Sequence, residues 1–526
     1  MSDVSYPKLR ILNAEPAKLL LWGGLISCAV GALALAGLAL IKGSFSHEHA
    51  WQSTHSTIIA RNFAEHGIFA LRGLPIENND PLTSELDTYL HWPPFFYYVL
   101  GGWVAIFGDS ARSIQLFMMM VVFATASTLG LIVRQFGSFA QAVFCGAAFI
   151  LMPATFRFGL TTQPVNLALL LQALALFFTA GVLRDEGRPS DSPRAMLFLS
   201  SAVFFLAIAA SWEVVLVLPG ILLAWLIRRD ARILRVLLWW SATCGLSLVM
   251  VGSLYAASDE TFVKELWNAF QLRAGLADYA PLPSRIHFLE GEAYSTITLR
   301  RLAELALRIP EFIHGIAIMG LCTLPFAIMG KGMRQIGSFG TVAVLSFASI
   351  WIGWAVLMKQ HFSAHNYQLL IASPVSAIGI SVLMALIADD GAPSTPRSLH
   401  LRHVLAGLAL PIGLMIAAVP SFVIFLRWQE PLIEFGREIR HNVPKGALVL
   451  TDQISSVPLY YSQRHILRGI EDEQQVRQKM SDIRRLCADC PLYLAIPLQS
   501  APKFNGLISG SSSALHGQNA VIVPLP

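Results

Sequence analysis

Residues 19–41 read LLLWGGLISCAVGALALAGLALI, an apolar run without a single charged residue. A helix that crosses the hydrocarbon core of a bilayer needs about 20 such residues. No small-residue cleavage pattern follows before the next polar loop, which argues against a cleaved signal peptide. We therefore predict that this run is a signal anchor that holds the chain in a membrane.

The composition of the whole chain agrees with a membrane protein. Hydrophobic residues make up 55% of the 526 positions and charged residues only 13%, whereas a soluble domain carries roughly 25% charge. The formal net charge is +5. Polytopic proteins place excess Lys and Arg in their cytoplasmic loops, so this charge gives no reason to expect a nucleic-acid partner.

Further apolar runs predict about eleven spans in all, which form a mainly α-helical transmembrane bundle. The expected spans are 19–41, 113–133, 139–156, 165–183, 195–211, 213–228, 236–256, 312–330, 338–357, 369–388 and 404–426. Counted this way, the basic loops all fall on the side of the N-terminus, which is therefore predicted to be cytoplasmic. The long loops 43–111 and 257–311 then lie on the opposite, outer side.

Residues 94–107, PFFYYVLGGWVAIF, are apolar but too short to span. If they did span, most later basic loops would move to the outside. We predict an interfacial helix or a re-entrant segment, because aromatic side chains favour the headgroup level.

The last hundred residues have a different pattern. Short apolar runs at 447–451, 492–497 and 520–524 alternate with a polar helical stretch at 472–485. This predicts a small α/β domain at 427–526, outside the membrane, after a transmembrane module at 1–426.

Cys487 and Cys490 lie in this domain, where a short structural disulfide is the leading interpretation. Redox chemistry lacks the strand-then-helix context, and a zinc site would need two more ligands.

The first outer loop begins with His47, Glu48 and His49. A carboxylate between two imidazoles can act as a general base or contribute to a metal site. The metal interpretation is weak, because adjacent residues do not share one helical face. An exposed polar loop without function remains the alternative. The same loop ends in His91-Trp92-Pro93-Pro94, which on its own is typical of a helix entry with aromatic anchors.

Five short motifs in this loop resemble the dolichyl-phosphate-mannose protein mannosyltransferases and the aminoarabinose transferases, which are GT-C glycosyltransferases. They are His47-Glu48-His49, Ala60-Arg61-Asn62, Glu65-His66-Gly67, His91-Trp92-Pro93-Pro94 and Phe107-Gly108-Asp109-Ser110-Ala111-Arg112. Later, His365-Asn366-Tyr367 with Pro374, and Tyr460-Tyr461-Ser462-Gln463-Arg464, are similar to family motifs in the same order. The likeness extends over nearly the whole chain.

The resemblance implies an inverting transfer of a sugar from a polyprenyl-phosphate donor to a hydroxyl acceptor at the outer face, most plausibly of a bacterial inner membrane. The acceptor would be a glycolipid, a polysaccharide or a protein. Glu48 matches the family's catalytic acid and would be the general base. His47 stands where the family usually has Asp, which leaves an altered donor or an inactive relative as alternatives. No cofactor is required, and a divalent metal remains an option.

The substrate-binding candidates share a place near the outer face. Cations would neutralise the leaving phosphate, Glu213 would contact sugar or acceptor hydroxyls, and Trp212 would stack on a sugar ring, although an interfacial belt is the favoured role for this tryptophan. The candidates are His47, His49, Arg61, His91, Arg112, Trp212, Glu213, Lys359, His365 and Tyr367.

Two other functions fit the composition. A transporter or flippase of a lipid-linked substrate would carry ionisable residues within its spans and would often show inverted repeats, neither of which is visible. A non-catalytic relative in a membrane assembly is favoured only by His47.

Overall fold

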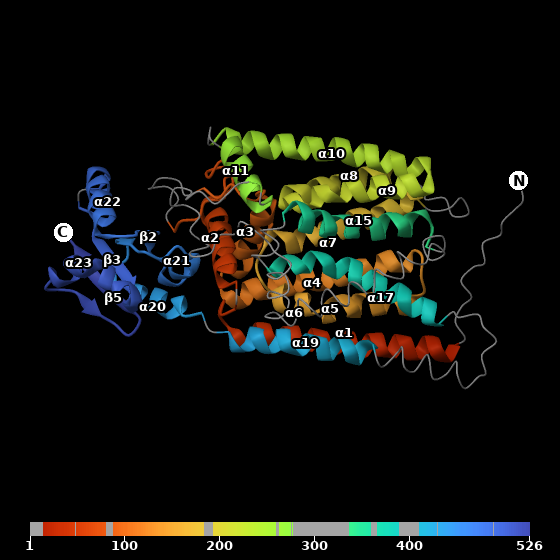
Figure 1. The fold of residues 1–526 in the computed structure, drawn as a ribbon, viewed down its shortest axis with the longest axis horizontal. Helices are drawn as coiled ribbons and strands as arrows, with labels where there is room; N and C mark the ends of the chain where they lie inside the picture. Colours follow the sequence, from red (N-terminus) through yellow and green to blue (C-terminus); the bar gives the residue numbers. More distant parts are fainter. Residues whose placement is uncertain are drawn as a thin grey trace, which may run out of the picture.

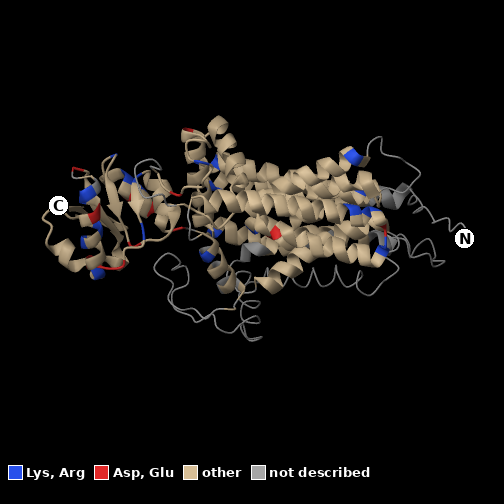
Figure 2. Cartoon of the chain, turned by 90° about the horizontal axis from the view of Figure 1, so that it is seen from above, with Lys and Arg blue, Asp and Glu red and all other residues tan. Residues whose placement is uncertain are grey.

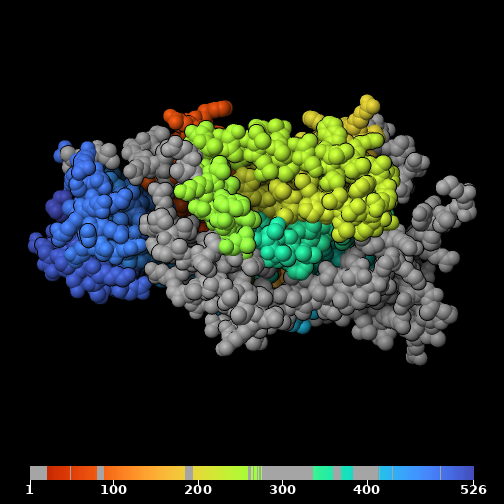
Figure 3. All heavy atoms as spheres, turned by 45° about the horizontal axis from the view of Figure 1, so that its top comes forward, coloured from red at the N-terminus to blue at the C-terminus, as the bar shows by residue number. Residues whose placement is uncertain are grey.

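The computed structural model describes residues 14–47, 49–79, 88–183, 193–258, 262–274, 276, 336–358, 366–388, 410–428, 430–487 and 489–526. They form an elongated molecule with a helical bundle in the middle and the C-terminal domain at one end (Figure 1). Figure 3 shows that domain as a separate lobe beside the bundle.

The bundle contains long apolar helices that run along the long axis of the molecule (Figure 1). They are α1 (Ala14–Lys42), α4 (Ala111–Arg134), α7 (Pro164–Leu183), α8 (Pro193–Ala210), α10 (Ala231–Ala256), α15 (Gly337–Leu357) and α19 (Leu410–Arg427). In the described part of the chain, seven helices are long and apolar enough to cross a membrane. All seven fall on predicted spans, so the mainly helical transmembrane fold is confirmed.

Three further predicted spans are shorter or interrupted helices. The run 139–156 is divided at Met152 into α5 (Phe139–Leu151) and α6 (Pro153–Phe158), because Pro153 cannot donate a helical hydrogen bond. The 3₁₀ helix η1 (Trp212–Leu216) leads into α9 (Val217–Arg228), and η2 (Asn366–Ala372) leads into α17 (Ser373–Ala388). The expected span 312–330 lies outside the described residues.

Charged residues gather at the two ends of the bundle and on the C-terminal domain, while the helices between are almost free of them (Figure 2). Many apolar side chains on the outer surface are exposed, such as Leu238, Leu246 and Val249 on α10. An apolar exterior costs nothing when lipid replaces water as the solvent.

Two short helices lie at the end of the bundle that faces the C-terminal domain. α2 (Ala50–His66) runs across the ends of the long helices (Figure 1), and α3 (Phe95–Phe107) packs closely against it. A β-carbon placed on Gly101 of α3 would lie 3.1 Å from the carbonyl oxygen of Ala60 and 3.1 Å from the β-carbon of Phe63. α3 has only 13 residues, which agrees with the prediction that 94–107 is not a full span. α11 (Phe262–Ala274) lies at the same end of the bundle (Figure 1).

The C-terminal domain is the predicted α/β unit. Its sheet has the order β2-β1-β3-β5-β4, in which β1 is parallel to β2 and β3, and β5 is antiparallel to β3 and β4. The strands are β1 (Leu448–Leu450), β2 (His465–Leu467), β3 (Leu492–Pro497), β4 (Leu515–His516) and β5 (Ala520–Leu525). The helical elements are α20 (Leu432–Asn442), α21 (Ser456–Ser462), α22 (Glu473–Leu486), η4 (Leu498–Phe504) and α23 (Asn505–Ser509). The apolar runs predicted β1, β3 and β5, whereas β2 and β4 were missed because each contains a histidine and neither lies in a continuous apolar run.

Candidate active site

α2 is a polar helix that is almost completely buried. Residues 52–57 read QSTHST, and each of their side chains is at most 2% exposed. This burial arises because the bundle covers one face of α2 and the C-terminal domain covers the other. Thr54 Oγ1 lies 3.0 Å from Ser456 Oγ of α21, and Ile58 packs in the apolar core of the C-terminal domain with Phe435 and Leu459.

The loop before α2 is held by His47. Its Nε2 lies 3.1 Å from Ser53 Oγ, and its ring stacks on Phe425 of α19 with 5.5 Å between centroids. Ser53 Oγ in turn accepts a 2.9 Å hydrogen bond from the backbone N–H of Thr162. Burial, together with the nearby His49 and Lys42, lowers the pKa of His47 to about 3. The ring is therefore neutral at physiological pH and acts as a packing and hydrogen-bonding group.

His49 points to a different neighbour. Its ring centroid lies 5.7 Å from that of Phe158 in α6, next to the buried Arg157, whose guanidinium lies 5.3 Å from the Phe158 centroid. The apolar sequence of α6 gave no indication that Arg157 is a buried cation at this end of the bundle.

Glu48 lies outside the described residues. Within the described residues, no group of three His, Cys, Asp or Glu side chains could hold a metal ion.

Two further candidate residues of the loop 43–111 and its end, Arg61 and Arg112, contact other residues of the chain. Arg61 pairs with Asp109 at 3.1 Å and with the side chain of Asn79, at the edge of a surface hollow of about 550 Å³. The Arg112 guanidinium lies against Gly43, where a β-carbon would come within 3.2 Å of it. Gly43 has φ +54°, which also favours glycine at this position.

The η1 turn meets the same loop from within the bundle. The Trp212 indole N–H donates a 2.9 Å hydrogen bond to the carbonyl of His91, which anchors η1 to the H-W-P-P segment. Glu213 is buried and accepts a hydrogen bond from the Ser211 hydroxyl. A buried carboxylate within a membrane bundle is costly unless it has polar surroundings, so its place here is consistent with a polar site.

The remaining substrate-binding candidates are Lys359, His365 and Tyr367. Lys359 and His365 lie outside the described residues. Tyr367 belongs to η2, and only its backbone is described. In the C-terminal domain, Cys487 and Cys490 form a disulfide with their Cα atoms 5.5 Å apart.

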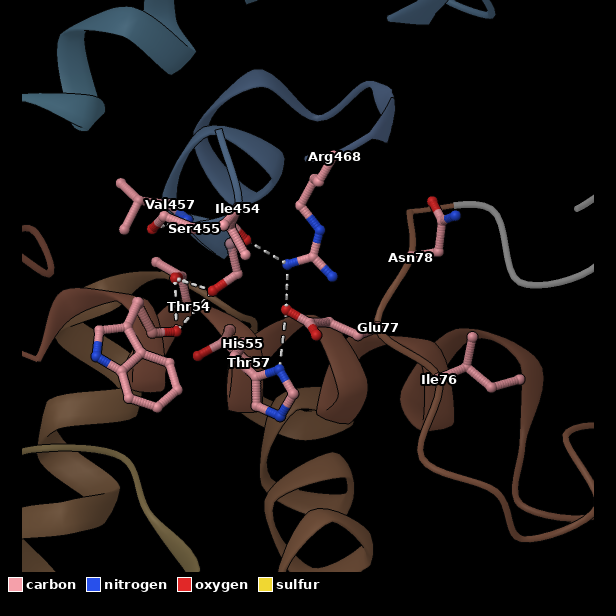
Figure 4. A network of polar contacts seen from close by, with 12 residues as sticks. Thr54, His55, Thr57, Ile76, Glu77, Asn78, Ile454, Ser455, Val457 and Arg468 are labelled. Atoms are coloured by element: carbon pink, nitrogen blue, oxygen red, sulfur yellow. Dashed lines mark hydrogen bonds and ion pairs between the residues drawn. The ribbon is translucent and has the colours of Figure 1, made fainter. Parts of the chain in front are cut away.

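A buried ionic cluster was missed by the sequence analysis. Glu77 Oε1 lies 2.9 Å from His55 Nδ1 of α2 and 2.8 Å from Arg468 Nη1 of the C-terminal domain (Figure 4). Arg468 also donates to the carbonyl of Ile454 at 3.1 Å. Burial raises the pKa of Glu77, but Arg468 and His55 outweigh it and bring that pKa to about 2. No local pattern signals the cluster, because Glu77 and Arg468 are 391 positions apart.

The described arrangement brings His47, His49, Arg61, His91, Arg112, Trp212 and Glu213 to the end of the bundle where α2, η1 and the loop 43–111 meet. What distinguishes it from an ordinary helix end is the number of buried polar side chains on α2.

No family profile matches this chain, and no curated protein sequence is significantly similar to it. Among solved structures, it is similar to ArnT from Cupriavidus metallidurans bound to undecaprenyl phosphate, with a TM-score of 0.63, 13% identity, and coverage of 95% of this chain and 97% of that one. The apo structure of the same protein gives a TM-score of 0.61 at the same identity and coverage. The apo oligosaccharyltransferase of Archaeoglobus fulgidus gives 0.56 with 13% identity, covering 91% of this chain and 70% of that one.

At this level of identity the likeness establishes the fold. The chain has the architecture of these membrane proteins, in agreement with the GT-C arrangement expected from its motifs.

Proposed function

We propose that this chain is an inverting glycosyltransferase that moves a sugar from a polyprenyl-phosphate donor to a hydroxyl acceptor at the outer face of the membrane. The observation that carries the proposal is the buried polar stretch 52–57 of α2 at the end of an apolar bundle. The likeness to ArnT, whose structure is described as bound to undecaprenyl phosphate, supports a polyprenyl-phosphate donor.

The proposed chemistry is a single displacement. Glu48 takes the proton of the acceptor hydroxyl, whose oxygen attacks the anomeric carbon of the donor sugar. The bond between that carbon and the phosphate oxygen breaks, and the lipid phosphate leaves with the electron pair. General-base catalysis of this kind contributes about 10²–10⁴-fold.

Cations near the outer end of the bundle would hold the phosphate. Arg112 and Arg157 lie at this end among the described residues, and Lys359 and His365 are proposed for the same role from their motif and loop position. Arg61 is less suited to this role, because Asp109 already neutralises its charge.

The test is transfer of radiolabelled sugar by the full chain in nanodiscs, from a panel of polyprenyl-phosphate hexoses and pentoses to a cell-envelope extract. Glu48→Gln should lower transfer at least about 100-fold, because the amide cannot take a proton. Glu65→Gln is the matched control, since it changes an exposed carboxylate at the far end of α2.

Full transfer by Glu48→Gln would rule out this base. Accumulation of donor in the opposite leaflet without any sugar transfer would favour a flippase. Repeating the assay with EDTA determines whether a divalent ion takes part.

A further inference from the structure

Three polar atoms on α2 are buried without a hydrogen-bond partner among the residues that the structure describes. They are Gln52 Oε1, His55 Nε2 and Ser56 Oγ, and none of them has a hydrogen-bond partner within the described part of the chain. The residues are spaced i, i+3 and i+4, so their side chains lie next to one another on the helix. Their side chains are as fully buried as those of a hydrophobic core.

Gln52 and Ser56 lie on a different face of α2 from the residues that contact the C-terminal domain, and His55 lies between the two faces, linked to that domain through Glu77 and Arg468. Thr54 and Ile58 contact that domain, and both point away from Gln52 and Ser56 by the 100° rotation per residue of a helix. Ala60, two turns after Gln52 and one turn after Ser56, contacts Gly101 of α3. Gln52 and Ser56 are therefore directed towards the bundle and α3, with His55 at the edge of this face.

Glu77 determines which atom His55 presents. Because the pKa of Glu77 is about 2, its carboxylate is ionised at neutral pH and accepts the hydrogen on His55 Nδ1. Nδ1 is therefore committed to Glu77, and Nε2 is the ring atom that remains to contact a ligand. Figure 4 shows the imidazole with this second nitrogen on the side away from Arg468.

The neighbours of His55 are aromatic. The Tyr89 ring lies edge-on with 4.0 Å between centroids, and the Tyr97 ring lies at 6.2 Å. The charged groups nearest to it, Glu77 and Arg468, are paired with each other. The face thus offers the Gln52 amide oxygen, His55 Nε2 and the Ser56 hydroxyl beside aromatic rings.

Buried polar atoms are normally paired, because leaving them unpaired is costly. Three such atoms on neighbouring positions of the helix point to a bound molecule with several hydrogen-bonding groups. The Gln52 amide oxygen can only accept, which disfavours an ionised phosphate, because its oxygens only accept as well. Hydroxyl groups on an uncharged ring are complementary to this set, and aromatic side chains pack well against such rings.

We propose that Gln52, His55 and Ser56 form a binding face for the hydroxyl groups of an uncharged sugar, with Glu77 as the residue that positions His55. The inference rests on the proposed function, and it assigns the sugar of the donor to this face and the phosphate to the cationic groups. It makes His55 a ligand-contacting residue and Glu77 a positioning residue.

The test compares two probes in nanodiscs that contain the full chain: a polyprenyl phosphate, and the same lipid bearing a neutral hexose. Affinities are measured by thermophoresis, and unfolding temperatures are measured in parallel. The wild type should bind the hexose-bearing lipid more tightly. Ser56→Ala and Gln52→Leu should each reduce that preference about tenfold, the loss of roughly one hydrogen bond, or about 1.4 kcal/mol.

The unfolding temperature separates binding from folding. Because Ser56→Ala and Gln52→Leu remove unpaired atoms, they should leave the unfolding temperature of the ligand-free protein unchanged or raise it. His55→Phe should abolish the preference for the hexose. Glu77→Gln should reduce it to a smaller extent, with the affinity for polyprenyl phosphate unchanged.

The matched control is Thr54→Val, on the opposite face of the same helix. Thr54 Oγ1 is hydrogen-bonded to Ser456, so its loss should lower the unfolding temperature and keep the hexose preference. Retained preference in Ser56→Ala and Gln52→Leu would show that these atoms hold only water, and would overturn the inference. Equal binding of both lipids by the wild type would overturn it too, while binding of neither would overturn the proposed function and this inference with it.

Discussion

α2 and α3 are neighbours that reverse the usual relation between polarity and burial. α2 is rich in hydroxyl and amide side chains, and residues 52–57 are almost inaccessible. α3 reads FFYYVLGGWVAIF, yet Ile106 is 75% and Phe107 57% exposed. In a soluble protein, both the burial of polar side chains on α2 and the exposure of apolar side chains on α3 would be unfavourable.

The difference shows that two solvents meet at this end of the molecule. Lipid accepts the apolar outer face of α3 without cost, so its exposure indicates contact with the membrane. Bulk solvent does not reach the buried face of α2, so its polar atoms must be satisfied by protein groups, by bound water or by a ligand. The buried polar helix is therefore the informative one for function, and the predictions below test the contrast between the two helices.

The largest effect is expected from Arg468→Met. This change leaves the ionised Glu77 buried without its main partner, which should cost about 3–5 kcal/mol. Glu77 bridges Arg468 to His55 of α2, so the loss of Arg468 should weaken the contact between the C-terminal domain and α2. Hydrogen exchange of the full chain in detergent should then show faster exchange in α2 and α21 but unchanged exchange in α7. Unchanged protection of α2 would mean that the ion cluster does not hold the domain in place.

Acid should weaken the same contact. The pKa of Glu77 is lowered from its ordinary value of 4.5 to about 2 by Arg468 and His55, against the effect of burial. A lowered carboxyl pKa contributes stability that is complete above the ordinary value and is lost as the pH falls towards the folded value. Protection of α2 should therefore decline between about pH 4.5 and about pH 2, and Glu77→Gln should remove this pH dependence. A decline that persists in Glu77→Gln would assign it to another group.

A smaller effect tests how closely the two helices approach. Gly101→Ala places a methyl group 3.1 Å from the Ala60 carbonyl oxygen and from the Phe63 β-carbon, so α2 and α3 must move apart at a cost of about 1–3 kcal/mol. Gly102→Ala is the control, because nothing lies within 4 Å of a β-carbon there, and it should stabilise by up to about 1 kcal/mol. Chemical unfolding in detergent measures both, and equal effects would refute the close contact.

The smallest effect is expected on the outer face of α3. Ile106→Ala should change the free energy of unfolding by less than about 0.5 kcal/mol, because Ile106 is mostly exposed. Leu100→Ala, on the buried face of the same helix, should cost about 2–5 kcal/mol. A large loss in Ile106→Ala would show that protein, not lipid or detergent, covers this face.

The sequence predicted the bundle well because the constraint on it is local. A span must satisfy every backbone hydrogen bond within itself and must have an apolar surface, so α1, α4 and α10 can be recognised from about 20 consecutive residues each. The strands β1, β3 and β5 could also be recognised locally, from short apolar runs in the sequence. Breaks such as the one before Pro153 were missed because the apolar run continues through them.

The candidate site was predicted only in part. The sequence indicated the first outer loop and singled out His47, Glu48 and Arg61 from residue type and motif order. It gave no reason to separate His47, which packs on Phe425, from residues that could face a ligand.

By itself, the sequence determined that the chain crosses a membrane many times, ends in an α/β domain, and carries polar residues in the loop after α1. Only the tertiary structure decided which of those polar residues are buried and which are paired. Glu77, His55 and Arg468 meet because the C-terminal domain covers α2. Such a contact depends on how whole elements pack, and hydrophobic periodicity, which fixes each element separately, carries no information about it.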